Sequence, residues 1–96
     1  MATANGHDNT KTSELLTFPC MIDIKAVGKR SARFEALVHE IVSRHIGPQD
    51  LLSTTHRESR GGNYVAITLT IRALGRAQLD AIYEALSASP EVLMAL

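Results

Sequence analysis

The stretch YVAITLTI, residues 64–71, constrains the fold of this chain more than any other part of the sequence. Its side chains alternate between apolar and mixed positions, which is typical of a β-strand and not of a helix. One face carries Val65, Ile67, Leu69 and Ile71, and the other carries Tyr64, Ala66, Thr68 and Thr70. Because one face is apolar along its whole length, we expect a central strand with that face on a hydrophobic core.

Periodicity predicts the remaining elements. Residues 18–27, FPCMIDIKAV, alternate in the same way and predict a second central strand, whereas the threonine-rich residues 50–59 predict a polar edge strand. Apolar residues at helical spacing predict one helix, whose apolar face runs from Phe34 to His45 and whose N-cap is Ser31, and another helix over residues 76–87. The segment EVLMAL, residues 91–96, predicts a short last strand.

These elements give the order βαββαβ and the class α+β. Two right-handed crossovers that each skip one strand position produce a ferredoxin-like sandwich, with a four-stranded antiparallel sheet in the order 4-1-3-2 and both helices on one face. A chain of 96 residues suits one domain, which we place at residues 13–96. Residues 1–12 lack an apolar run and predict a disordered tail and not a signal peptide.

Charge and composition narrow the class of partner. Ten Lys and Arg balance ten Asp and Glu, and this balance argues against nucleic acid, because proteins that bind nucleic acid usually carry a basic excess. The apolar runs are too short to span a membrane, and a single cysteine, Cys20, suits a reducing cytosol. We therefore expect a cytoplasmic protein that binds neither nucleic acid nor a membrane.

One motif nevertheless points toward RNA. Arg60, Gly61 and Tyr64 fit the spacing of an octamer found in RNA-binding domains, which stack bases on aromatic side chains of both central strands. Gly62 stands where that octamer needs another aromatic, and Asp23 stands at the outward position of the other central strand. The motif is better interpreted as a hairpin turn that leads into a strand.

The candidate ligand site is the segment VGKRSARF, residues 27–34, which leads from a strand into the start of a helix. Backbone N–H groups at a helix start favour anions, so we predict Gly28, Lys29 and Arg30 as ligand-binding residues. An acylphosphatase-like hydrolase uses an arginine in such a loop, but it also needs an asparagine on the following strand. Residues 51–59, LLSTTHRES, contain none, and no catalytic residue is predicted.

The other reactive side chains are dispersed. His39 and His45 lie six residues apart on one predicted helix, His56 is isolated and His7 lies in the tail, so no metal site and no cofactor is predicted. Cys20 has the inward parity of its strand, which predicts a small buried apolar side chain.

The open side of the sheet and the last strand are candidate interfaces. Residues 92–96, VLMAL, are apolar on both faces, and the order 4-1-3-2 places them at an edge, where unpaired backbone groups accept another strand. We predict Tyr64, Leu93 and Ala95 as interface residues. A weak homodimer or a contact with another protein is expected.

Several short motifs in order resemble the small, uncharacterised YbeD-like proteins of bacteria: ELLTFP at 14–19, KAVG at 25–28, RH at 44–45, GNY at 62–64 and IYEAL at 82–86. The resemblance covers about residues 13–96, and Gly28 matches the family's glycine at the end of the first strand. The chain departs from the family at residues 31–33, where a proline is expected, and at residues 60–61 in the hairpin.

The resemblance implies a fold similar to the ACT regulatory domains and a regulatory role associated with lipoate metabolism, and it brings no established catalytic residues. We therefore expect a non-enzymatic regulatory module that binds a small anionic ligand or a partner protein. An acylphosphatase-like hydrolase and a purely structural adaptor are the alternatives.

Overall fold

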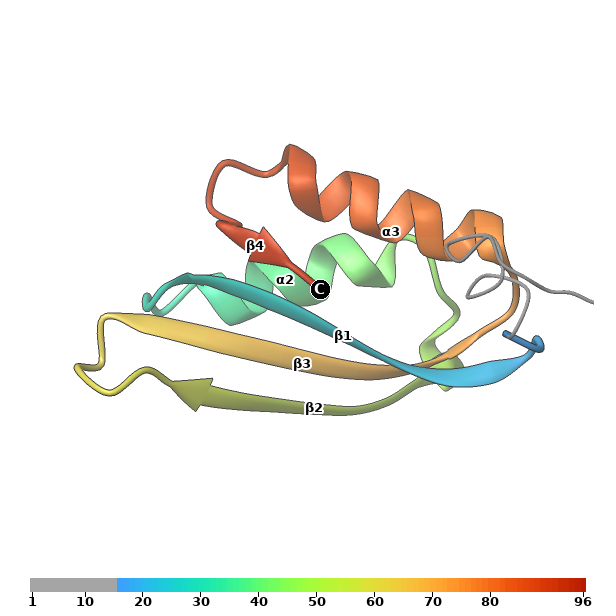
Figure 1. Ribbon diagram of the computed structural model, residues 1–96, viewed down its shortest axis with the longest axis horizontal. Helices are drawn as coiled ribbons and strands as arrows, with labels where there is room; N and C mark the ends of the chain where they lie inside the picture. The colour runs from blue at the N-terminus through green and yellow to red at the C-terminus, as the bar shows by residue number, and fades with distance from the viewer. Residues whose placement is uncertain (1–15) are drawn as a thin grey trace, which may run out of the picture.

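The computed structural model describes residues 16–96, which form one antiparallel sheet with two helices on one of its faces (Figure 1). The elements are β1 (Cys20–Lys29), α2 (Phe34–Ser43), the short 3-10 helix η1 (Pro48–Asp50), β2 (Leu51–Glu58), β3 (Tyr64–Ala73), α3 (Arg76–Ala88) and β4 (Met94–Ala95). The strand order is β2-β3-β1-β4, so the predicted ferredoxin-like topology is confirmed. The predicted tail, residues 1–12, lies outside the described residues.

The two central strands pair along their whole length. β1 and β3 are antiparallel, with Cys20 opposite Ala73 and Lys29 opposite Tyr64. Burial alternates along both strands as their sequences predict, and Ile24, Ile67 and the other inward side chains toward their middle are fully or almost fully buried. The residues with the opposite parity lie on the side of the sheet away from the helices, which we call the outer face.

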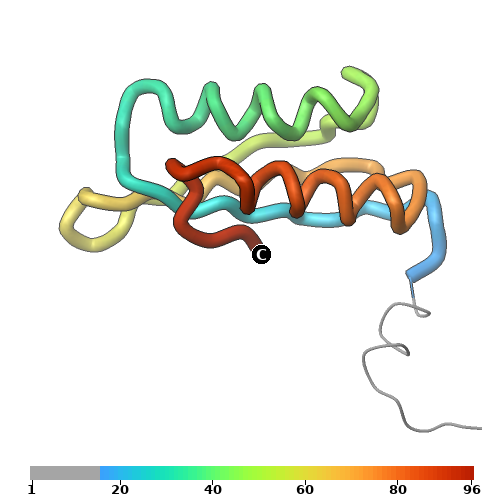
Figure 2. The backbone as a smooth tube through the Cα atoms, turned by 90° about the horizontal axis from the view of Figure 1, so that it is seen from above, coloured from blue at the N-terminus to red at the C-terminus, as the bar shows by residue number. Residues whose placement is uncertain are grey.

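The helices form a single layer over the other face of the sheet. Figure 2 shows α2 and α3 side by side, running in opposite directions. Each helix directs its apolar stripe into the core, which is the burial expected of an amphipathic helix. The buried helical residues are Phe34, Val38, Ile41 and Val42 on α2, and Leu79, Ile82 and Leu86 on α3.

The start of α2 differs from the sequence prediction. Ser31 was predicted as the N-cap, but the helix begins at Phe34, and Arg33 occupies the cap position without a side-chain hydrogen bond to the helix. Ser31 instead accepts a hydrogen bond from the backbone N–H of Phe34 through its carbonyl oxygen, at 3.3 Å. The chain makes a turn over Ala32 and Arg33 before the helix starts. Ser31 therefore lies two residues before the cap position, and its side chain does not cap the helix.

The last strand is shorter than the predicted residues 91–96. β4 comprises only Met94 and Ala95, which lie opposite Val27 and Ala26 of β1. Backbone hydrogen bonds nevertheless extend to both sides of it: the N–H of Leu93 donates to the Val27 oxygen at 2.8 Å, and Leu96 exchanges two bonds with Lys25. The order of the sheet places β4 at one edge and β2 at the other.

Candidate functional site

The predicted ligand loop begins at Gly28, whose role in the structure is packing. A Cβ atom at this position would lie 2.4 Å from Cε1 of Phe34 and 2.6 Å from the carbonyl oxygen of Glu91. Phe34 is 1% exposed and forms part of the core. The glycine therefore allows the first helical side chain to pack directly on β1, and this accounts for it without a ligand.

Arg30 is held by the β2–β3 hairpin. Its Nε donates to the carbonyl oxygen of Gly62 at 2.8 Å, and its backbone N–H donates to the carbonyl oxygen of Asn63 at 2.9 Å. Its guanidinium also lies 3.7 Å from a carboxylate oxygen of Glu58. The backbone of Gly62 has φ 76°, a left-handed conformation that glycine adopts readily and that shapes this turn. Arg30 thus joins the loop after β1 to the hairpin.

Two of the predicted ligand residues border hollows. Arg30 borders one of about 250 Å³ that also contains the carboxylates of Glu35 and Glu58. The hollow beside Lys29 has a volume of about 290 Å³ and is lined by Lys29, Ser31, Phe34, Pro90, Glu91 and Leu93. Most of its lining is apolar, and the Glu91 carboxylate on its rim accepts a hydrogen bond from Arg33 at 3.3 Å. The structure therefore brings Lys29 together with Leu93, which was predicted as an interface residue.

The three predicted interface residues lie on different surfaces. Tyr64 is on the outer face and is 42% exposed, whereas Leu93 is 60% exposed and borders the hollow beside Lys29. Ala95 is half-buried, opposite Ala26, and packs against the hydrophobic core. A single contact surface cannot include all three side chains.

The outer face carries an apolar strip that crosses three strands: Met94 on β4, Val27 on β1, and Ala66 and Tyr64 on β3. Met94 and Ala66 both lie directly opposite Val27, so these side chains share one face. A shallow hollow of about 240 Å³ lies over Val27, Tyr64 and Ala66, and Arg57, Glu58 and Ser59 also line it. Met94 is 52% exposed.

Three cations surround this apolar strip. Lys25 and Lys29 lie two residues to either side of Val27 on β1, and Arg57 lies opposite Ala66 on β2. Within residues 16–96, none of the three forms an ion pair. Sequence reasoning missed the cluster, because neither the pairing of Val27 with Met94 nor that of Ala66 with Arg57 follows from the order of strands alone.

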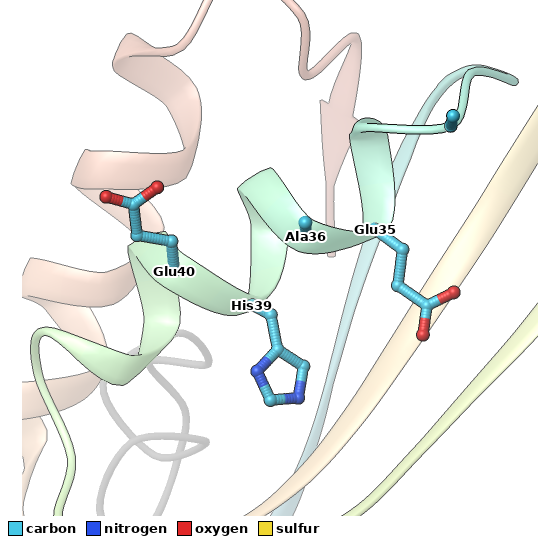
Figure 3. Close-up of a pocket in the computed structure, with 5 residues that line it drawn as sticks. Glu35, Ala36, His39 and Glu40 are labelled. Carbon is cyan, nitrogen blue, oxygen red and sulfur yellow. The ribbon is translucent and has the colours of Figure 1, made fainter.

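A larger hollow runs along the exposed side of α2. It has a volume of about 630 Å³ and is lined by Ala32, Glu35, Ala36, His39 and Glu40. Figure 3 shows Glu35 and His39 projecting toward the strands, whereas Glu40 projects from the other side of the helix. Each side chain has its own partner: Glu35 lies 3.6 Å from His56, His39 lies 3.3 Å from the Thr54 hydroxyl, and Glu40 pairs with Arg44 at 2.7 Å.

Three further features of the described residues bear on function: possible metal ligands, membrane-spanning helices and shifted pKa values. Within the part of the chain that the structure describes, no three His, Cys, Asp or Glu side chains are placed to hold a metal ion. No helix there is long and apolar enough to cross a bilayer. Burial on α3 raises the pKa of the Tyr83 phenol above its ordinary value of 10.0, because the charged phenolate loses solvation.

The fold recurs in two solved structures. Protein HP0495 from H. pylori superposes with a TM-score of 0.66 over 96% of this chain and 98% of that one, at 12% identity. The uncharacterised protein TM1266 from Thermotoga maritima superposes with a TM-score of 0.59 over 79% and 92%, at 16% identity. At such identities these matches show a shared fold.

Sequence relatives establish the family. A UPF0250 protein of Paraburkholderia phymatum is 40% identical over 82 residues, which cover 85% of this chain and 92% of the relative. Another, from Chromobacterium violaceum, is 39% identical over 83 residues, or 86% and 93%. Residues 13–96 match the family model described as a protein of unknown function, DUF493. The chain therefore belongs to the DUF493/UPF0250 family of small, uncharacterised bacterial proteins, the YbeD-like proteins that its motifs resemble.

Proposed function

We propose that this protein is a cytoplasmic, non-enzymatic regulatory module, similar to ACT domains, that acts by binding a partner protein through the outer face of its sheet. The observation that carries the proposal is the apolar strip on that face. Met94 and Tyr64 are about half exposed there, and both helices lie on the opposite face. Exposed apolar side chains that gather over several strands and have polar neighbours are typical of a protein-binding surface.

Alternatively, the regulatory module binds a small anionic ligand. The cationic side chain of Lys29 supports this alternative. The Lys29 side chain is exposed beside the largely apolar hollow of about 290 Å³. Arg30 and Arg33 support it less, because Gly62, Glu58 and Glu91 already bind their guanidinium groups. We therefore place partner binding first.

Affinity capture from a native bacterial extract tests the proposal with two matched variants. Ala66→Glu places a charged side chain in the middle of the apolar strip, and Ala77→Glu makes the same change at an exposed position of α3. We expect wild type and Ala77→Glu to retain the same protein and Ala66→Glu to lose it. A protein that all three variants retain equally would contradict binding through the outer face.

The hydrolase and the adaptor are tested separately. Turnover of an acyl phosphate that disappears in Arg30→Ala, with the fold intact by circular dichroism, would favour the acylphosphatase-like enzyme. An adaptor would join two proteins at once, so both would be recovered together in the capture experiment. The association with lipoate metabolism rests on the family resemblance, and lower or higher lipoylation of cellular enzymes after gene deletion would test it.

A further inference from the structure

We propose that the partner presents an acidic amphipathic helix, whose apolar stripe packs on the strip of Met94, Val27, Ala66 and Tyr64 and whose carboxylates pair with Lys25, Lys29 and Arg57. This inference rests on the proposed function, because it names the chemistry of the partner for the same face.

The charges of the two sides of the molecule differ in sign. The ionisable side chains on the outer face of the described residues are Asp23, Lys25, Lys29, Arg57 and Arg72. Asp23 accepts a hydrogen bond from Thr70 at 2.6 Å, and Arg72 pairs with the buried Asp50 at 3.4 Å. Asp50 offsets Arg72, whereas Asp23 keeps its negative charge, so Lys25, Lys29 and Arg57 leave this face with an excess of about two positive charges. A negatively charged partner is therefore favoured.

The side of the molecule formed by α2 and α3 has an excess of negative charge. Its exposed carboxylates are Glu35, Glu40, Asp80 and Glu84. Its cations Arg44 and Arg76 each pair with a carboxylate four residues away on the same side, at 2.7 and 3.2 Å. An acidic partner would therefore be repelled by the helices and attracted by the sheet, which fixes the face that it uses.

The dimensions of the strip suit a helix. Strands in a sheet lie about 4.8 Å apart, so the strip spans about 10 Å from β4 to β3. Apolar side chains at positions i, i+4 and i+7 of a helix span about 10.5 Å along its axis, at a rise of about 1.5 Å per residue. Lys25 and Lys29 then lie on opposite sides of that axis, each about 7 Å from Val27, within reach of flanking carboxylates.

A second copy of this chain does not fit the outer face equally well. A two-fold face-to-face dimer brings the same surface together, so Lys25, Lys29 and Arg57 of one copy would meet the same cations of the other. Like charges juxtaposed in an interface are unfavourable. The charge pattern therefore favours a different protein on this face.

Three synthetic helical peptides test the inference. They share leucines at positions i, i+4 and i+7 and carry Glu, Gln or Lys at the flanking positions. Each is titrated into the full ¹⁵N-labelled chain, and amide shifts give both the affinity and the location. We expect the Glu peptide to bind at least tenfold more tightly than the Gln peptide, to perturb Val27, Ala66 and Met94, and to weaken when salt is raised.

Two double variants make the test specific. Lys25→Glu/Lys29→Glu should abolish the preference for the Glu peptide and confer one for the Lys peptide. Arg44→Glu/Arg76→Glu makes the same change in net charge on the helical side, and it should leave the preference unchanged. Thermal unfolding of each variant checks that it is folded at the temperature of the titration.

Each other outcome overturns the inference in a recognisable way. Equal affinity for the Glu and Gln peptides on the outer face would remove the acidic partner and leave the proposed protein-binding face standing. No binding of any peptide, or shifts confined to α2 and α3, would remove the amphipathic helix as the ligand of the face. Self-association of the chain that the double lysine variant abolishes would make the occupant the acidic helical side of a second copy.

Discussion

At the scale of single residues, two of the predicted ligand positions have structural roles. Gly28 makes room for the Phe34 ring, and Arg30 bonds to the hairpin. Both roles depend on the close approach of segments that are distant in the sequence. A glycine or an arginine in a loop is therefore weak evidence for a ligand until its neighbours are identified.

Gly28→Ala should lower the free energy of unfolding by about 1–3 kcal/mol, because the added methyl group would overlap the Phe34 ring and the Glu91 carbonyl. Urea denaturation measures the change. Gly75→Ala is the matched control, since a Cβ there meets no atom within 4 Å, and it should change stability by much less. Equal losses in the two variants would contradict a packing role for Gly28.

Ile67→Ala should cost about 2–5 kcal/mol, because it empties a fully enclosed site in the middle of the core. Ile22 has the inward parity of β1 but is only half-buried, so Ile22→Ala should cost less than Ile67→Ala. Tyr64→Ala, on the outer face, should cost least of the three. Chemical denaturation of the three variants gives this order, and a loss at Tyr64 as large as that at Ile67 would contradict the assignment of faces.

At the scale of elements, α3 introduces a dependence of stability on alkaline pH. Burial raises the pKa of Tyr83 in the folded protein above 10.0, so the folded state keeps this proton while the unfolded state loses it. The contribution of Tyr83 to stability is therefore fully present below pH 10 and is lost as the pH rises above 10 toward the folded pKa.

Tyr83→Phe should consequently make the free energy of unfolding fall less steeply above pH 10 than it does in the wild type. Denaturation at a series of pH values from 8 to 11 provides the measurement. A Tyr83→Phe curve that runs parallel to that of the wild type would contradict the raised pKa of Tyr83 in the folded protein.

The two edge strands differ in how well they are protected. β2 is polar and eight residues long, and its helix-facing residues Thr54 and His56 meet His39 and Glu35 on α2. β4 is short and its flanking residues Leu93 and Leu96 are both 60% exposed. Unprotected apolar edges favour strand addition, so β4 is the edge at which we expect self-association.

At the scale of the whole molecule, the distribution of charge favours a different protein on the outer face, whereas the position of β4 favours a homodimer at the sheet edge. The cations of the outer face disfavour a face-to-face dimer, whereas β4 lies at the edge of the sheet and carries exposed apolar side chains. A weak homodimer and a different protein partner are therefore compatible on one molecule, since they use different surfaces.

Leu93→Lys should abolish the weak homodimer that we expect through β4 while leaving the melting temperature nearly unchanged, because Leu93 is 60% exposed. Ala95→Lys would instead disturb the core, so it is unsuitable as a test of the interface alone. Sedimentation velocity at several protein concentrations provides the measurement. A monomer at every concentration, with or without the lysine, would remove the homodimer.

The sequence by itself determined the order of elements, the sheet topology and the face of each central strand. These follow from the periodicity of apolar residues within single segments, and from the handedness of crossovers, which is general to proteins. Family membership also follows from the sequence, through short motifs whose order is specific.

Only the tertiary structure decided what the individual site residues do. Arg30 forms a hydrogen bond with Gly62, which is 32 residues away in the sequence, and Arg33 forms one with Glu91, which is 58 residues away. No local sequence pattern encodes such contacts. The apolar strip likewise depends on register, which places Met94, Val27 and Ala66 in one row. Register is set by the packing of the whole sheet on its helices, so the cations around that row become a cluster only when the chain folds.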